Sequence, residues 1–143
     1  MNIPAKVDYA YKAVLELALR YKDESPVQLS TICQAQNIPK KFLTQILLRL
    51  RNAHIVNSSR GVEGGYNLTR PPSQISLADV LKAVDDSIIG SPKKAKAGKA
   101  SDADRLILKI WEDINKETVN RVEAITFDRL ATQVRNEQFT YYI

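Results

Sequence analysis

A short glycine-rich segment between two strand-like stretches constrains the fold of this chain more than any other feature. Residues 60–65 read RGVEGG and contain three of the five glycines in the 143-residue sequence. The flanking segments, 55–59 and 66–69, are short and strand-like, and glycine permits the tight backbone that joins them. The pattern predicts a β-hairpin with a glycine tip, placed directly after a basic helix.

Apolar residues at helical spacing predict three helices before this hairpin. The first helix has an apolar face formed by Val7, Ala10, Tyr11, Val14, Leu17, Ala18 and Tyr21. The second helix is short. The third has Pro39 at its first position and ends near Asn52. Four apolar residues form its inward face: Leu43, Ile46, Leu47 and Leu50. Two helices joined by a tight turn predict a helix-turn-helix, and the hairpin supplies a wing.

The outward face of the third helix has the chemistry of a surface that reads DNA. Glutamine pairs with adenine through two hydrogen bonds, lysine reaches guanine, and threonine contacts bases or the thymine methyl group. Arg49 and Arg51, on the flanks, suit phosphates. Arg60 at the base of the wing suits a narrow minor groove, and the wing glycines let the backbone approach DNA closely. The predicted DNA-binding residues are Lys40, Lys41, Thr44, Gln45, Arg49, Arg51, Arg60, Gly61, Gly64, Gly65 and Tyr66.

The distribution of charge agrees with this interpretation. The formal net charge is +5, and residues 1–70 hold all of the excess, with ten basic and five acidic residues. Residues 71–143 hold eleven of each and are neutral. A basic half joined to a neutral half indicates a module that binds nucleic acid and a module for assembly or sensing.

The second half predicts a mainly α architecture with a long helix. Ser76 is the expected N-cap of a fourth helix. Residues 90–100 read GSPKKAKAGKA, and the long helix begins after them at Ser101. A last helix of about ten residues follows Thr126. The long helix has an apolar stripe that a domain of this size cannot cover, which favours a two-fold dimer interface. The predicted dimerisation residues are Leu106, Ile107, Ile110, Trp111 and Ile114.

We therefore expect a winged helix-turn-helix domain over residues 1–88, a lysine-rich flexible linker over 89–100, and a dimerisation helix with a short final helix over 101–143. Double-stranded DNA and a second copy of the chain are the expected partners. The sequence shows no signal peptide and no membrane-spanning run, so we expect a cytoplasmic protein with no membrane partner.

Single cysteine and histidine residues exclude several other classes of protein. Cys33 alone excludes an intrachain disulfide and any site built from several thiolates, and we expect it to be a buried apolar residue. His54 alone excludes a multi-histidine metal site within one chain and leaves little room for a catalytic triad. The glycines of residues 61–65 lack the Lys-Ser/Thr ending of a P-loop. We expect a protein that is not an enzyme, with no metal and no cofactor.

Several stretches give the chain a resemblance to a known family. They are Asp8-Tyr9-Ala10, Pro26-Val27 with Leu29, Phe42 to Leu47 with Arg49-Leu50-Arg51, the wing from Ser59 to Tyr66, and Ala83-Val84-Asp85. Together they resemble the Rrf-type family of winged helix-turn-helix transcriptional regulators, which includes iron–sulfur cluster, nitric-oxide-sensing and cysteine-metabolism regulators. The resemblance implies a homodimeric, sequence-specific regulator with a long C-terminal dimerisation helix. We expect the dimer to act as a repressor on a near-palindromic operator, while activation stays open.

The chain departs from the cluster-binding members of that family. Those members carry three cysteines between the fourth helix and the long helix, whereas residues 90–104 contain none. A cluster held mainly by thiolates cannot form here. Two alternatives stay open: a redox sensor whose cluster has non-cysteine ligands, and a winged-helix module that binds protein rather than DNA. A small-molecule effector or a partner enzyme also stays open.

Overall fold

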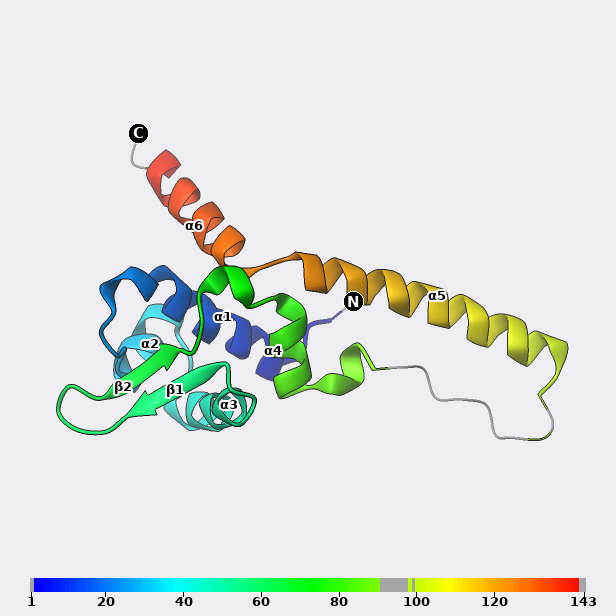
Figure 1. Cartoon of the computed structure of the whole chain (residues 1–143), viewed down its shortest axis with the longest axis horizontal. Helices are drawn as coiled ribbons and strands as arrows, with labels where there is room; N and C mark the ends of the chain where they lie inside the picture. Colours follow the sequence, from blue (N-terminus) through cyan, green and yellow to red (C-terminus); the bar gives the residue numbers. More distant parts are fainter. Residues whose placement is uncertain (1, 91–97, 99, 142–143) are drawn as a thin grey trace.

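The helices of residues 5–52 and the two-stranded sheet form a packed body, and the long helix of residues 102–124 projects from it. The computed structural model describes residues 2–90, 98 and 100–141. Figure 1 shows α1 and α4 above α3 and the sheet, with α5 extending to one side as a single rod and α6 rising from the point where α5 returns. The elements are α1 (Ala5–Leu19), α2 (Leu29–Gln36), α3 (Lys40–Asn52), β1 (Val56–Ser59), β2 (Gly65–Leu68), α4 (Leu77–Val84), α5 (Asp102–Ala124) and α6 (Phe127–Tyr141).

The main core lies where α1, α2 and α3 meet. The four inward residues predicted for α3 are all buried, which confirms its periodicity: Leu43, Ile46, Leu47 and Leu50. A buried carboxylate joins α1 to α2, because Glu16 accepts hydrogen bonds from Arg20 at 2.6 Å and from Gln36 at 2.7 Å. These contacts fix the angle between the first helix and the helix-turn-helix.

The predicted N-cap at Ser76 is confirmed, and Ser101, predicted to begin the long helix, is the N-cap of α5. Ser76 and Ser101 each accept a hydrogen bond from the backbone of the residue three positions later, and Asp79 and Asp104 return bonds to the cap backbones. These two capping boxes satisfy backbone donors that a helix start leaves open. The hydrogen bonds from the backbone and side chain of Ser101 hold the pKa of Asp104 below its usual range.

The junction between α5 and α6 is joined to the segment before α4 through the backbone. The Leu77 amide donates to the Ile125 carbonyl, and the Phe127 amide donates to the Ile75 carbonyl, both at 2.9 Å. Phe127 is fully buried in the main core and packs on Tyr11, with ring centroids 6.1 Å apart. Burial raises the pKa of the Tyr11 phenol to about 12. The start of α6 is therefore part of the same core as α1.

This shared core differs from the predicted division of the chain. Phe127 and Ala131, from the segment 101–143, are buried among residues of the segment 1–88, so a boundary at residue 101 does not divide the core. The two segments meet because α6 packs against α1, a contact between residues more than a hundred positions apart. The predicted linker over 89–100 lies mostly outside the described residues, although Ile89 is buried against α1 and α4.

Four local predictions were wrong. Tyr21 lies beyond the end of α1 in a separate 3-10 turn and is exposed, because the helix stops at Leu19. Pro39 is the N-cap of α3 rather than its first helical residue. Cys33 packs against the core but is only partly buried. The final helix has 15 residues rather than about ten.

Candidate nucleic-acid interface

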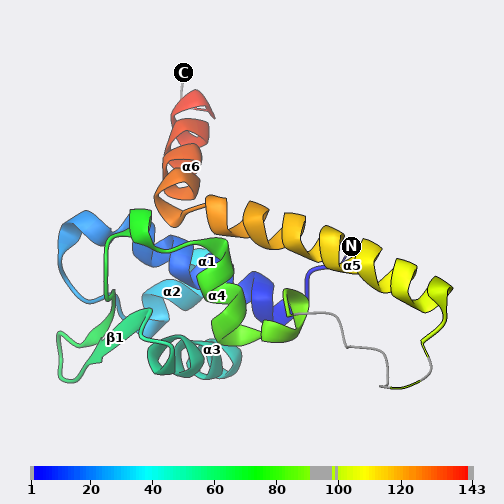
Figure 2. The same cartoon turned by 45° about the vertical axis from the view of Figure 1, so that its right-hand side comes forward.

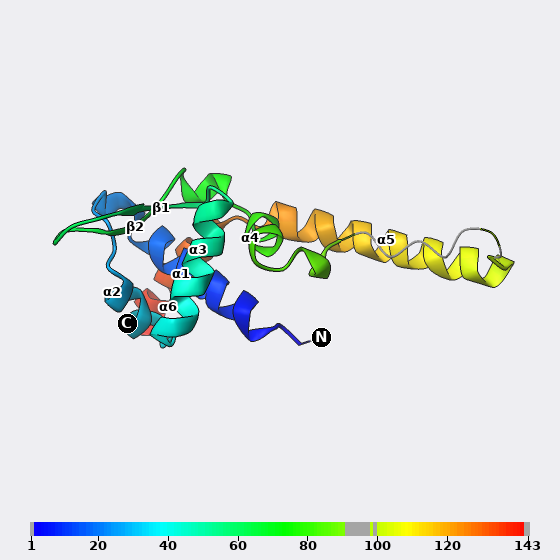
Figure 3. The same ribbon diagram turned by 90° about the horizontal axis from the view of Figure 1, so that it is seen from below.

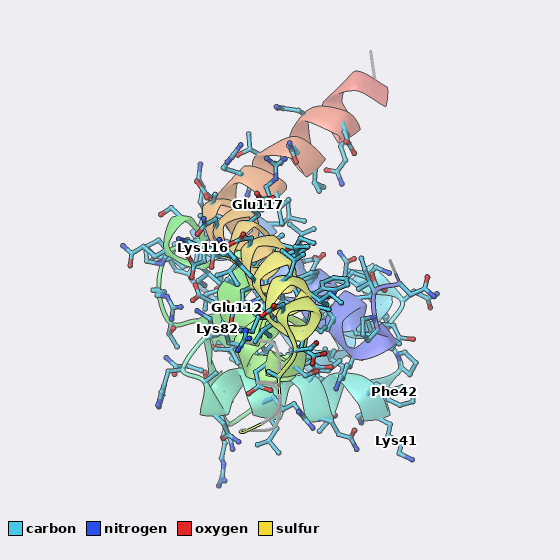
Figure 4. All side chains as sticks on the ribbon, turned by 90° about the vertical axis from the view of Figure 1, so that its right-hand side faces the viewer. Lys41, Phe42, Lys82, Glu112, Lys116 and Glu117 are labelled. Carbon is cyan, nitrogen blue, oxygen red and sulfur yellow. The ribbon has the colours of Figure 1, made fainter. Side chains whose placement is uncertain are left out.

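The residues of α3 that are predicted to read DNA lie along its exposed side. The side chains of Lys40, Lys41, Thr44 and Gln45 are exposed at its N-terminal half, while the opposite side is buried in the core. Figure 3 shows α3 in front of the other helices with the wing extending beside it. Figure 4 places Lys41 at the right-hand end of α3, below α5 in that view. The helix thus presents its polar side on an open surface.

Hydrogen bonds within the chain orient two of the predicted DNA-binding residues, Thr44 and Arg51. The Thr44 hydroxyl donates to the Lys40 carbonyl at 2.8 Å, so its oxygen is left to accept a bond and its methyl group is left for apolar contact. Arg51 donates to the Ser58 hydroxyl at 3.3 Å and thereby links the end of α3 to the first wing strand. The helix and the wing are therefore fixed relative to one another on the same side.

The wing is an antiparallel hairpin, as predicted. β1 and β2 pair from Val56 with Leu68 to Ser59 with Gly65, and the turn between them holds Arg60 at an exposed position. Gly61 has a φ of +112°, a backbone conformation that side chains rarely adopt. The tip is held by a hydrogen bond from the Gly64 amide to the Gly61 carbonyl at 3.0 Å.

The other two wing glycines serve packing within the chain. A Cβ on Gly64 would overlap the Ser59 carbonyl, and a Cβ on Gly65 would overlap the Val27 carbonyl. Next to this contact, Val27 and Tyr66 exchange two backbone hydrogen bonds of 2.9 Å. The wing therefore lies on the segment before α2. Gly65 permits that contact and Gly64 permits the tight turn of the hairpin, whether or not they also approach DNA.

Sequence reasoning missed two residues that shape this surface. The Gln28 side-chain amide donates to the Val62 carbonyl at 3.5 Å and so joins the wing tip to the start of α2. Phe42 is 50% exposed on α3 and stacks on Tyr9 of α1. Its signal in the sequence is a large apolar residue outside the buried periodicity of its helix.

The apolar stripe predicted on α5 is uncovered in the single chain. Its five residues are between 45% and 60% exposed, while Val119 and Val122, further along, pack against a small cluster that includes Leu81. Figures 1 and 2 show α5 extending sideways beyond α4, with α3 on the other side of α4. The stripe and the basic helix thus occupy separate surfaces.

The donors of this chain do not fit a cluster or ion held by several thiolates or imidazoles. The sequence contains one cysteine and one histidine, and the segment between α4 and α5 contains neither. Within the described residues there is no group of three or more His, Cys, Asp or Glu side chains arranged to hold a metal ion.

An exposed basic α3, packed behind by α2 and flanked by a two-stranded wing, defines a winged helix-turn-helix DNA-binding protein. A model of the Rrf2 family, described as iron-dependent transcriptional regulators, matches residues 3–133. The chain belongs to this family. Among the helices that the structure describes, none is long and apolar enough to cross a membrane.

Relatives and solved structures agree with this assignment. The chain is 36% identical over 138 residues to a Synechocystis protein named as an HTH-type transcriptional regulator, covering 96% of this chain and 92% of that one. It is 33% identical over 138 residues to IscR of Xenorhabdus nematophila, covering 96% and 82%. The structure of CymR, the global cysteine regulator of B. subtilis, aligns with a TM-score of 0.76 at 27% identity, covering 92% and 97%. The structure of T. potens IscR aligns with a TM-score of 0.75 at 28% identity, covering 93% and 88%.

These likenesses confirm the predicted fold class and the predicted family. They also support the function, because the relatives are named as transcriptional regulators and not as enzymes. The protein is a DNA-binding transcriptional regulator. The individual DNA-contacting residues and the dimer stay predictions.

Proposed function

We propose that two copies of this chain pair through the apolar stripe of α5 and repress transcription by occupying a near-palindromic operator that polymerase must cross. The observation that carries this proposal is the stripe itself. Five large apolar side chains, including Trp111 at 59% exposure, are clustered on one helix and left open to water. Monomeric proteins rarely expose contiguous apolar area of this kind, and a two-fold partner would cover it.

The position of the stripe supports simultaneous pairing and DNA binding. Because α5 extends beyond the domain and α4 separates it from α3, a partner helix on the stripe would leave both recognition helices open (Figure 2). A two-fold axis through the α5 pair would present the two α3 helices to the same side of a duplex. Half-sites about one helical turn apart, or a multiple of it, are the geometric expectation for such a dimer.

Within each half-site the residues of α3 and the wing take different roles. Lys41, Thr44 and Gln45 reach base edges in the major groove, where side chains distinguish all four base pairs. Lys40 and Arg51 contact phosphates, and Arg60 enters the adjacent minor groove. The exposure of these side chains and the link from Arg51 to the wing support these roles.

Selection of genomic fragments with the purified protein tests the proposal. The recovered fragments should share an inverted repeat, and the Kd for that repeat should rise steeply with salt concentration because counterions are released on binding. Gln45→Ala should relax base preference, while Arg60→Ala should lose most affinity on sites with A/T-rich flanks. Recovered fragments without two-fold symmetry, or a chain that stays monomeric on an operator, would overturn it.

A control variant separates these effects from a general loss of positive charge. Lys82 lies on α4, is not one of the predicted DNA-binding residues, and pairs with Glu123 at 3.6 Å. Lys82→Ala removes one positive charge, as Arg60→Ala does, and should leave both the affinity and its salt dependence close to those of the wild type. Equal losses in the two variants would assign the effect to net charge rather than to the wing.

A further inference from the structure

A small cavity lies beside the recognition helix and has no role in the interface as predicted from the sequence. Its volume is about 180 Å³, and it lies between α1 and α3. Two buried residues, Ile46 and Val84, line its inner part, and the rings of Tyr9 and Phe42 line its side. Three polar residues, Gln45, Lys6 and Arg49, line the rest of it. An amide that can read a base and an aromatic surface therefore share one opening.

Phe42 is held in place although half of it is exposed. Its ring centroid lies 6.2 Å from that of Tyr9, with the planes 29° apart, so the two rings stack. Figure 4 shows Phe42 at the same end of α3 as Lys41, the end whose residues contact bases in a helix-turn-helix. An apolar ring that is open to water and held at this end is available for contact with an apolar group on the DNA.

The major groove offers one such partner. Among the groups that base pairs present there, the 5-methyl group of thymine is the apolar one, and it lies on the same edge as the adenine atoms that glutamine recognises. An A·T pair, or two adjacent ones, therefore supplies a hydrogen-bonding edge for Gln45 and a methyl group for the neighbouring cavity. No other base pair presents both groups.

We propose that Phe42, stacked on Tyr9, forms an apolar subsite that reads a thymine methyl group beside the base read by Gln45. The inference rests on the proposed DNA face, and adds to it a specificity-determining residue and the base that this residue selects. The subsite makes A·T pairs favourable through methyl contact as well as through hydrogen bonds. Tyr9 acts as a positioning residue, because it holds the ring of Phe42 and does not itself reach the groove.

Replacing thymine by uracil in the operator tests the subsite directly, since the exchange removes the methyl group and leaves every hydrogen-bonding atom in place. The probe is the duplex recovered by fragment selection, synthesised with thymine and with deoxyuridine. Wild-type protein should bind the uracil duplex about fourfold more weakly for each methyl group that the subsite buries. Phe42→Ala should bind the thymine duplex more weakly, and should no longer distinguish the two duplexes.

Two further variants keep this test specific. Leu48 is a matched control, since it is 49% exposed on the same helix, and Leu48→Ala should keep the full preference for thymine. Phe42→Leu retains an apolar side chain, and should keep part of the preference even if Phe42→Ala loses stability. Single thymine-to-uracil exchanges should then locate the effect at one or two positions in each half-site.

The outcomes separate this inference from the function on which it rests. Wild-type protein that binds thymine and uracil duplexes equally, or Phe42→Ala that retains the whole preference, would overturn the subsite while operator binding stands. A wild-type protein that binds no thymine duplex at low salt would overturn the operator proposal, and the subsite with it.

Discussion

The guanidinium group of Arg49 on α3 donates a hydrogen bond to the carbonyl oxygen of Val84, the last residue of α4, at 3.1 Å. Beside this bond, Lys6 of α1 forms an ion pair of 2.8 Å with Asp85. The two contacts join three helices at one corner of the domain. Arg49, predicted from the sequence to meet phosphates, therefore also closes the end of α4, where carbonyl groups lack helical partners.

Arg49→Ala should lower both stability and DNA affinity. Loss of a charge-assisted, partly exposed hydrogen bond should reduce the free energy of unfolding by about 1 kcal/mol, measured by urea denaturation. Affinity for specific and unrelated duplexes should fall by similar factors. Arg51→Ala is the comparison, because its exposed bond to Ser58 should contribute less than about 0.5 kcal/mol. Identical denaturation midpoints for Arg49→Ala and the wild type would contradict the role in stability.

Gly65→Ala should displace the wing without unfolding the domain. The added Cβ would overlap the Val27 carbonyl, so β2 must move away from the segment before α2. We expect a loss of about 1–3 kcal/mol in unfolding free energy and a clear loss of operator affinity, read from denaturation and from titration of labelled duplex. Val62→Ala, at a side chain that is 95% exposed, should leave stability unchanged. Wild-type affinity in Gly65→Ala would show that the position of the wing does not matter for binding.

Ile110→Lys should prevent pairing through α5. A lysine in the middle of the stripe would face its own copy across a two-fold axis, and burial of unpaired charge should weaken dimerisation on the order of a hundredfold. Sedimentation velocity over a range of concentrations measures the change. Asn120→Lys adds the same charge at an exposed position of α5 beyond the stripe, and should leave the dimer intact. Equal association of both variants would place the interface elsewhere.

The pH dependence of stability should include a contribution from Asp85. Hydrogen bonds from Lys6 and Ser87 hold the pKa of the Asp85 carboxyl below its usual range in the folded chain. This group therefore stabilises the fold above the unfolded-state pKa, near 3.9, and the contribution disappears as pH falls through the lower folded-state pKa. In urea titrations between pH 6 and about pH 3, Asp85→Asn should be less stable than wild type at the upper end and approach it at the lower end. A constant difference across that range would contradict the assignment.

Local chemistry explains why much of the fold could be predicted from the sequence. The inward face of α3 follows from residues three and four positions apart, and the caps at Ser76 and Ser101 follow from a serine and an aspartate three residues later. The hairpin follows from its glycines. Each of these signals lies within a few residues of the structure that it specifies.

Contacts between distant segments account for what could not be predicted. The stacking of Phe42 on Tyr9 depends on where α1 crosses α3, and the reason for glycine at position 65 is a carbonyl group nearly forty residues earlier. The place of α6 in the main core likewise depends on a helix from the opposite end of the chain. Periodicity identifies which side of a helix is buried, but not which helix covers it.

The backbone bonds that join Leu77 to Ile125 and Ile75 to Phe127 set the direction in which α5 leaves the domain. In a pair of chains held together by α5, the geometry of this junction would determine how many base pairs separate the two half-sites. Residues inserted between α4 and α5 would leave that spacing unchanged. Phe127→Pro would change it, because proline has no amide hydrogen to donate to the Ile75 carbonyl.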